Sequence, residues 1–358
     1  NPSAQVSNPV DMLGGAEPEE FSHCLSTLLD DPGIDIFLPI LVPQSLVNPG
    51  DVARAIVKNA DQTDKTVLAC MVGENSLAEA RRVLHKNEVP LSIFPEVPGN
   101  ILGAMLQYRR WLEKEHTSVF YFLGIQSKDA AQLFSQSNKQ VLGEADTRPI
   151  LEAYGFDLVP GGFAKDAAQA AAITEIIGFP VALKVVSDQV LHKSDLGGIS
   201  LDLDTDDALV DAMGDMRQKI LNGKPDAQID GFLIEKMAPK GLEVIIGMRR
   251  DPTFGPLIMF GLGGVYVELF KDVGFGIAPL SPEGAREMIQ ATKAGALLQG
   301  FRGGPVYDMD AVVDAIGRLS QLALDFPAIS EVEINPLLVL PQGGGATVLD
   351  ARMILEKE

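Results

Sequence analysis

Apolar runs and amphipathic segments alternate along the first third of the chain. The apolar runs are short, and between them lie longer segments whose apolar residues recur at helical spacing. The runs are residues 34–42, 65–72 and 91–97, and the amphipathic segments are residues 51–60, 76–87 and 100–115. Strand and helix in turn predict a parallel sheet covered by helices on both faces. Residues 1–125 are therefore predicted to form a small doubly wound α/β domain.

A polar stretch without a sustained apolar stripe follows at residues 126–141, and we interpret it as an interdomain linker. Two further units are predicted after it. Residues 142–229 combine helices at 144–156 and 164–178 with a strongly apolar strand at 180–187. Residues 230–358 are richer in strands and predict an α+β unit that faces the smaller one. Its strands are residues 231–237, 242–250, 257–264, 331–340 and 346–354, with helices that begin at Pro282 and Asp310.

Composition and length support several folded domains. The chain has 358 residues, of which 46% are hydrophobic and 22% charged, enough for two or three compact cores. No apolar run reaches about eighteen residues and no basic-then-apolar leader opens the chain, so we expect a cytoplasmic protein without membrane contact. The chain begins with Asn1 rather than Met, which suggests a fragment or a processed subunit. Cys24 and Cys70 lack the spacing of a zinc site or a disulfide framework and are predicted to be buried thiols.

The net charge of −20 argues against nucleic acid as a partner, because nucleic-acid affinity comes largely from Lys and Arg. A nucleoside triphosphate could still bind where lysine, backbone N–H groups and Mg²⁺ are concentrated locally. The charge therefore restricts a phosphate site to a small part of the chain.

Two features near residue 190 could contact such an anion. Lys184 interrupts the apolar strand 180–187, and it either reaches an anion in a cleft or pairs with a nearby carboxylate. His192 and Asp195 stand in a polar loop that ends in Gly197 and Gly198, which permit close approach of the backbone. A histidine in such surroundings is also commonly a solvated side chain. The residues alone leave both questions open.

Carboxylates and an amide mark the ends of later strands. Glu235 and Glu243 could accept a hydrogen bond from an amine or a ribose hydroxyl, or could be rim carboxylates. Glu333 and Asn335 are two apart, hence on one face of a strand, and Asp350 ends the next strand. Oxygen ligands of this kind suit Mg²⁺, although an Asn–Pro turn and a solvated Asp would look the same.

The order of these residues matches what an ATP-grasp site needs. Residues 178–203, 231–237, 241–273 and 330–340 closely resemble the ATP-grasp half of the NDP-forming acyl-CoA synthetases, which are relatives of succinyl-CoA synthetase. Residues 8–14 and 68–84 resemble the flavodoxin-like domain that precedes this half in fused members of the family. The resemblance implies a flavodoxin-like domain followed by a two-subdomain ATP-grasp fold.

The resemblance also implies roles for individual residues. ATP phosphates would contact Lys184, adenine would lie against Glu235 and the Met237 backbone, and the ribose would bind Glu243. Glycines beside the phosphates would be Gly263 and Gly264, and Mg²⁺ would be held by Asn335 and Asp350 with Glu333 beside them. His192 would accept a phosphoryl group as phosphohistidine, with Asp195 as a neighbour that could fix its tautomer. The helix start at Gly73, Glu74 and Asn75 would hold the phosphate of a phosphohistidine, or Gly73 simply makes a tight turn.

The sequence departs from the family in one main respect, which concerns the two domains that lie N-terminal to this region in family members. The CoA-binding Rossmann domain and the domain with the mobile catalytic histidine have no counterpart here, and His23, His85 and His116 do not match that histidine. A smaller one is Arg148, where relatives commonly carry Lys. CoA would therefore bind mainly to the missing part, and this chain alone would be incomplete. Self-assembly stays open, because relatives assemble through these domains.

The implied function is the nucleotide half of an ADP-forming acid–CoA ligase. A carboxylic acid, CoA and ATP would give acyl-CoA, ADP and phosphate through acyl phosphate and phosphohistidine. Two alternatives are a non-catalytic module that senses ATP or acyl-CoA, and an ATP-grasp ligase that joins a carboxylate to an amine. The sequence fixes neither the acid nor the choice between ATP and GTP.

Overall fold

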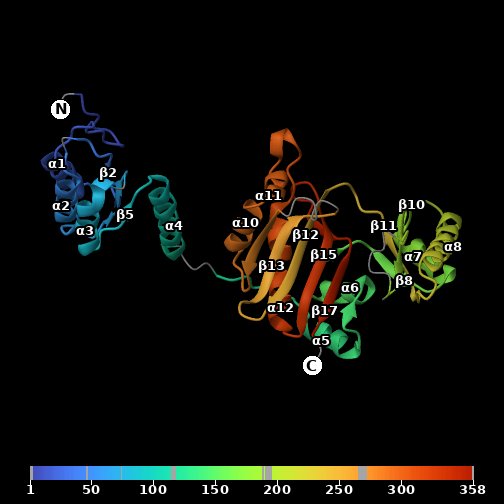
Figure 1. Ribbon diagram of the computed structural model, residues 1–358. Coiled ribbons are helices and arrows are strands. Elements are labelled where there is room, and N and C mark those ends of the chain that lie inside the picture. The colour runs from blue at the N-terminus through green and yellow to red at the C-terminus, as the bar shows by residue number, and fades with distance from the viewer. Residues whose placement is uncertain are drawn as a thin grey trace. The chain divides into compact units, whose positions relative to one another are not determined.

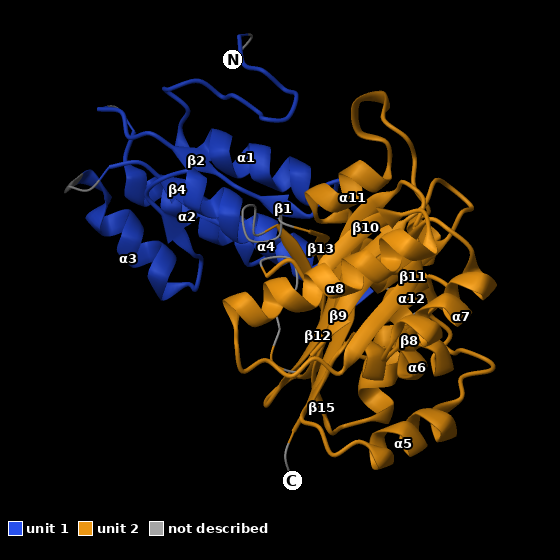
Figure 2. Ribbon diagram, turned by 90° about the vertical axis from the view of Figure 1, so that its right-hand side faces the viewer, with its two compact units in different colours: residues 1–116 blue, residues 117–358 orange. Residues whose placement is uncertain are grey.

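The computed structural model describes residues 3–45, 47–73, 75–113, 118–187, 189, 196–264 and 272–356. The chain divides into two compact units, residues 1–116 and residues 117–358, which are coloured separately in Figure 2. Among the residues described, no helix has the length and apolar character needed to cross a membrane.

Residues 1–116 are built on short parallel strands. β1 (Ile36–Phe37) pairs with β3 (Thr66–Val67), and β4 (Ala69–Met71) lies between β2 (Ile40–Leu41) and β5 (Leu91–Ser92). Every pairing among them is parallel, which confirms the predicted parallel α/β character. The helices of this unit are α1 (Pro18–Leu29), α2 (Pro49–Ala60), η1 (Asn75–Leu77), α3 (Ala78–Lys86) and α4 (Glu96–Glu113).

Helix α2 shows how local sequence sets these elements. The Asn48 side chain accepts a hydrogen bond from the Gly50 N–H at 2.8 Å, and Pro49 fills a first-turn position where no donor is needed. Val52 and Ile56, one turn apart, are both buried in the core of the unit. The cap therefore fixes the start of the helix, and the apolar stripe fixes the face that it turns inward.

The second unit begins earlier than the sequence suggests. The expected linker at residues 126–141 contains α5 (Ser127–Gln136), and the boundary between units lies at residue 116 rather than 125. Ala130 is fully buried, and Leu133 and Phe134 pack against the same core. The linker prediction is wrong because three apolar positions at helical spacing are enough to dock a helix whose other side chains are polar.

An eight-stranded sheet forms the larger part of residues 117–358. Its main path is β14 (Val273–Ile277), β13 (Gly255–Leu262), β12 (Leu242–Asp251), β15 (Ile329–Val339), β16 (Ala346–Val348) and β7 (Asp157–Leu158), and β17 (Ala351–Leu355) joins β15 to β6 (Val141–Leu142). Figure 1 shows this sheet with its helices α6 (Glu144–Ala153), α10 (Pro282–Gln290), α11 (Lys293–Leu298) and α12 (Met309–Asp325). A short turn, η2 (Phe301–Gly303), follows α11. Helix α12 packs its buried face on β12, β13 and β15.

A smaller antiparallel sheet has the strand order β10 (Ile199–Leu203), β9 (Val181–Val186), β11 (Gly231–Lys236) and β8 (Gly161–Ala164). Helices α7 (Ala167–Ile177) and α8 (Asp206–Gly223) belong to it, and these elements share one core.

The predicted subdomain boundary at residues 229 and 230 is wrong. β11 pairs with β8 and β9, so it belongs to the smaller sheet, whereas β6 and β7 pair with strands of the larger one. The smaller sheet is thus inserted between two parts of the larger one. An apolar run shows that a strand exists, but its partners are set by long-range pairing that the run does not encode.

Candidate functional site

Lys184 lies on β9, an inner strand of the smaller sheet. On β9 it is paired with Leu233 of β11 and Ile199 of β10. Its neighbours Leu183 and Val185 are fully buried in the core of that sheet. Because successive side chains of a strand point to opposite faces, the Lys184 side chain leaves the other face of the sheet, where it is only 8% exposed.

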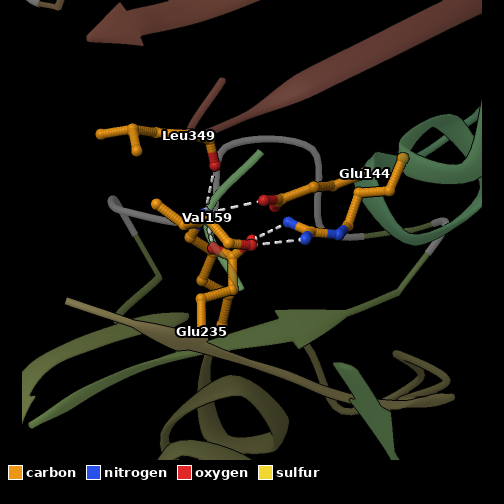
Figure 3. A network of polar contacts seen from close by, with 6 residues as sticks. Glu144, Val159, Glu235 and Leu349 are labelled. Carbon is orange, nitrogen blue, oxygen red and sulfur yellow. Dashed lines mark hydrogen bonds and ion pairs between the residues drawn. The ribbon is translucent and has the colours of Figure 1, made fainter. Parts of the chain in front are cut away.

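The Lys184 ammonium is surrounded by oxygen acceptors (Figure 3). Its Nζ lies 2.7 Å from Glu144 Oε1 and 2.6 Å from Glu235 Oε2, and it also donates to the carbonyl of Leu349. Glu144 comes from α6 and Leu349 follows β16, so both belong to the larger-sheet part of the unit. The ammonium therefore links the two sheets.

Arg148 completes this buried network. It lies one helical turn after Glu144 on α6, and its guanidinium donates to Glu235 Oε1 and, at 2.6 Å, to the Val159 carbonyl. Two cations and two carboxylates are thus buried together, which compensates their charges and offsets part of the cost of removing them from water.

Burial and charge act against each other in this network. Burial by itself lowers the pKa of Lys184, but the negative charges of Glu144, Glu235 and Asp350 outweigh it and raise the pKa above its ordinary value. Burial raises the pKa of the Glu235 carboxyl, and the charge of Glu144 adds to that effect against the pull of Lys184. Lys184 consequently stays a cation at neutral pH, and the structure shows the carboxylate pairing that the sequence left as one of two possibilities.

A cavity of about 430 Å³ opens beside Lys184, and four of the predicted site residues line it: Lys184, Glu235, Met237 and Glu243. Its apolar wall includes Val159, Ala182, Leu201, Leu338 and Leu349. The lining residues come from both sheets and from the segment at 237–241 that follows β11. Lys236 and Lys240 also line the cavity, and an apolar wall combined with cationic groups suits a ligand that has a flat apolar part and an anionic part.

The backbone N–H of Met237 already forms a hydrogen bond within the protein. The Met237 N–H donates to the Pro180 carbonyl at 3.1 Å, and the preceding N–H of Lys236 donates to the Pro160 carbonyl at 2.8 Å. The Met237 N–H is therefore occupied in this structure, and a base contact from that residue would fall to its carbonyl or side chain.

Glycines at the end of β13 allow a close approach between strands. A Cβ on Gly263 would lie 2.9 Å from the backbone of Val244, and Gly264 has φ +64°, a conformation that favours glycine. The Gly264 N–H donates to Asn335 Oδ1 at 3.1 Å. Gly263, Gly264 and Asn335 are thus brought together, next to Glu243.

The predicted Mg²⁺ ligands are assembled in part. The Asn335 N–H donates to the Asp350 carbonyl at 3.0 Å, and the Asn335 amide donates to Glu333 Oε1 at 3.3 Å. Glu333 is committed to an ion pair with Arg352 at 2.7 Å. Within the part of the chain that the structure describes, no group of three or more His, Cys, Asp or Glu side chains could hold a metal. Mg²⁺ commonly takes one or two protein oxygens and completes its shell with water and phosphate, and the assignment of Asn335 and Asp350 as its ligands stays a prediction.

Several predicted residues lie outside the described part of the chain. These are His192, Asp195, Glu74 and His116. Gly73 has φ +124°, as a tight turn requires, and the turn leads into η1 and then α3. The structure therefore supports the turn at Gly73, and its role toward a phosphohistidine stays a prediction.

Glu144 was missed in the sequence, and Arg148 was noticed only as a departure from relatives. Glu144 resembles an ordinary acidic residue in the first turn of a helix, which the helix dipole favours. Helical spacing could have identified Glu144 and Arg148 in the sequence. Residues 144, 147, 148 and 151 share one face of α6, and all four are buried.

Comparisons with known proteins agree with this geometry. A family model described as an ATP-grasp domain matches residues 134–355. Acetate–CoA ligase [ADP-forming] I of Archaeoglobus fulgidus is 38% identical over 354 residues, which cover 98% of this chain and 50% of that protein. The beta subunit of acetate–CoA ligase [ADP-forming] I of Pyrococcus furiosus is 41% identical over 221 residues, which cover 62% of this chain and 94% of that subunit.

A solved structure is also similar to part of this chain. It is acetyl-coenzyme A synthetase 1 of Ca. Korarchaeum cryptofilum in complex with coenzyme A, Ca-AMPCP and HgCl⁺. The TM-score is 0.61 at 40% identity, and the match covers 64% of this chain and 100% of that chain. The chain spans about half the length of the full-length curated relatives that it matches first.

Proposed function

Since this chain belongs to the ATP-grasp family of ADP-forming acyl-CoA ligases, we propose that it is the nucleotide-binding and phosphoryl-transfer part of an acid–CoA ligase. The complete reaction would convert a carboxylic acid, CoA and ATP into acyl-CoA, ADP and phosphate. Because the chain spans about half of such relatives, the proposal assigns CoA and the acid mainly to the remainder of the longer protein.

The observation that carries this proposal is the position of Lys184. A buried, protonated amine lines an apolar-walled cavity between two sheets, so a phosphate could bind the amine while the base packs against the apolar wall. Glu243, at the cavity edge, would accept hydrogen bonds from the ribose, and Glu235 and Met237 would lie against adenine. Gly263 and Gly264 would leave room for the phosphates.

Asn335 and Asp350 would hold Mg²⁺, with Glu333 beside them, and the ion would supply further charge neutralisation at the phosphates. The charge of Asp350 acts on Lys184, so the Mg²⁺ and phosphate positions would be adjacent. Phosphoryl transfer needs mainly positioning and charge neutralisation, which these groups could provide.

His192 would be the phosphoryl acceptor. An imidazole nitrogen would form a bond to the γ-phosphorus of ATP while the bond to the ADP oxygen breaks, and the nitrogen must be unprotonated to do so. Asp195 would fix the tautomer by accepting a hydrogen bond from the N–H of the other ring nitrogen. The start of the segment at Gly73, Glu74 and Asn75 would meet a phosphohistidine phosphate.

The experiment is incubation of the chain with γ-labelled ATP and Mg²⁺, followed by measurement of protein-bound label. We expect an acid-labile, alkali-stable label that disappears in His192→Ala. His85→Ala is the matched control, because His85 is an exposed histidine on α3, and it should keep the label.

Two outcomes would favour the alternatives. ATP binding without any label would favour a module that senses nucleotide without turnover. ADP release that requires an added amine, again without label, would favour a carboxylate–amine ligase.

A further inference from the structure

Helix α3 carries basic side chains on two successive turns. They are Arg81, Arg82, His85 and Lys86, which we call the basic cluster, and all four are exposed. Arg81 and His85 are four positions apart, as are Arg82 and Lys86, so the members of each pair are neighbours on the helix surface. This cluster stands in a chain whose net charge is −20.

The basic cluster lacks partners within the protein. None of its four side chains forms an ion pair or a hydrogen bond with any residue that the structure describes. The carboxylate of α3, that of Glu79, lies instead 2.8 Å from Arg54 of α2. Like charges three or four positions apart on a helix destabilise it, so the cluster weakens α3 unless an anion binds there.

The helix dipole accounts for only part of the cluster. His85 and Lys86 lie in the last turn of α3, where the partial negative charge of the helix end favours cations. Arg81 and Arg82 lie one turn earlier, and the effect of the dipole falls off within the last turn. Helix stability therefore leaves the two arginines without an explanation.

Two cavities adjoin the basic cluster. One has a volume of about 540 Å³ and is lined by Arg81 and His85 together with residues of the segment 89–97. The other has a volume of about 650 Å³ and is lined by Ala78 and all four members of the cluster. Both volumes are typical of small-molecule sites. Neither lining includes an Asp or Glu among the residues described, although the chain as a whole is acidic.

The cavity of 540 Å³ also has an apolar side. Its lining from the segment 89–97 consists of Val89, Pro90, Leu91, Ser92, Ile93 and Val97. The Ser92 hydroxyl donates to the Phe94 carbonyl at 2.8 Å, so its hydrogen is already used. Recognition of a charged ligand in this cavity therefore falls to Arg81 and His85, while the opposite side offers apolar contact.

The chemistry of these groups favours a phosphate over a monocarboxylate. A guanidinium can donate two parallel hydrogen bonds to a phosphate. A monocarboxylate carries one negative charge, whereas a phosphate ester carries nearly two at neutral pH and presents three acceptor oxygens. Arg81, Arg82 and Lys86 together match the larger charge. The apolar side of the cavity suits a hydrocarbon or aromatic group attached to that phosphate.

The geometry points to a binding site for an organic phosphate between α3 and β5. The phosphate binds Arg81 and Arg82, and the apolar group of the ligand occupies the cavity of 540 Å³. This site lies within residues 1–116, whereas every residue found to line the cavity beside Lys184 belongs to residues 117–358. The inference therefore goes beyond the proposed function and does not depend on it.

The test is calorimetric titration of the full chain with phenyl phosphate, which combines a phosphate with an aromatic ring. In the double variant Arg81→Gln/Arg82→Gln, we expect the Kd to rise by about tenfold or more, because charge-assisted hydrogen bonds are lost. In Arg81→Lys/Arg82→Lys, the Kd should be intermediate, since lysine keeps the charge but loses the second parallel hydrogen bond. All these substitutions are at exposed positions.

Arg109→Gln/Arg110→Gln is the matched control. These are also two adjacent, exposed arginines, and they lie on α4 of the same unit. Neither lines the two cavities, so the double variant removes the same charge and should leave the Kd for phenyl phosphate unchanged.

Ile93→Ala tests the apolar side of the cavity. We expect it to raise the Kd for phenyl phosphate severalfold, because apolar contact with the ring is lost, and to leave the Kd for inorganic phosphate unchanged.

A Kd for phenyl phosphate that is equal in wild type and Arg81→Gln/Arg82→Gln would overturn the inference. The same holds if the Arg109→Gln/Arg110→Gln control weakens binding equally, or if the wild-type chain does not bind phenyl phosphate. Inorganic phosphate that binds as tightly as phenyl phosphate, with no effect of Ile93→Ala, would overturn the assignment of the cavity to an organic ligand.

Discussion

Asp251 closes the turn between β12 and β13. Its Oδ1 accepts hydrogen bonds from the N–H groups of Thr253 at 2.7 Å and Phe254 at 2.9 Å. These bonds favour the ionised carboxylate and lower the pKa of Asp251 below its ordinary value of 3.8. A carboxyl with a depressed pKa in the folded state stabilises that state above its ordinary pKa, and the contribution is lost as the pH falls through the folded-state value.

We therefore expect Asp251→Ala to lower the Tm at neutral pH, and the difference from wild type to shrink as the pH falls below 3.8. Thermal unfolding from neutral pH to about pH 3 measures this. Asp226→Ala is the control, because Asp226 is exposed and forms no hydrogen bond or ion pair with any residue that the structure describes. A difference that is constant with pH would contradict the role of the ionised carboxylate.

Single residues of the candidate site could be predicted where they break a local pattern. Lys184, Glu235 and Glu243 interrupt apolar strands, and the structure brings all three to one cavity. Glu144 breaks no such pattern, because acidic residues are common in the first turn of helices. Its burial depends on a lysine forty positions away in the chain, which only the fold reveals.

At the scale of elements, Gly317 shows how a segment without regular structure is anchored. Gly317 lies on α12, and a Cβ there would be 2.6 Å from the ring of Phe120. Phe120 also donates its N–H to the Leu280 carbonyl at 3.2 Å and stacks on Phe122 at 5.4 Å. The glycine therefore provides the space into which this aromatic ring packs.

Gly317→Ala should destabilise the chain by up to about 2 kcal/mol, because overpacking costs about 1–3 kcal/mol and the better helix propensity of alanine returns about 1 kcal/mol. Gly214→Ala on α8 is the control. Gly214 has nothing within 4 Å of an added Cβ, so its substitution should stabilise by about 0.5–1 kcal/mol. Urea unfolding measures both changes, and equal stabilisation by the two substitutions would mean that Phe120 does not pack against α12.

The positions of strands and helices were predicted better than the pairing between strands. The strands around residues 180–187 and 231–237 exist as expected, but the sequence did not show that β11 completes the smaller sheet. Helix α5 was missed because its buried stripe is only Ala130, Leu133 and Phe134. Periodicity reports which face of an element is apolar, whereas pairing is decided by contacts far apart in sequence.

For the whole molecule, the insertion of the smaller sheet limits how the chain can be divided. The chain passes between the two sheets twice, near residues 158–161 and again near residues 236–242. No single cut separates them. The division at residue 116 is different, because the buried core of residues 1–116 shares no member with the cores of residues 117–358. A relative of Pyrococcus furiosus that matches 62% of this chain is itself a separate subunit.

Independent cores predict two unfolding transitions, and the position of the cavity predicts which one responds to nucleotide. All residues that line the cavity beside Lys184 belong to residues 117–358, so bound nucleotide should stabilise that unit alone. At a free ATP concentration of a hundred times Kd, the stabilisation would be about 2.7 kcal/mol. Scanning calorimetry of the full chain should show one transition that moves to higher temperature with ATP and one that does not. Residues 117–358 expressed alone should show only the first, and an equal shift of both transitions in the full chain would mean that the two units unfold together.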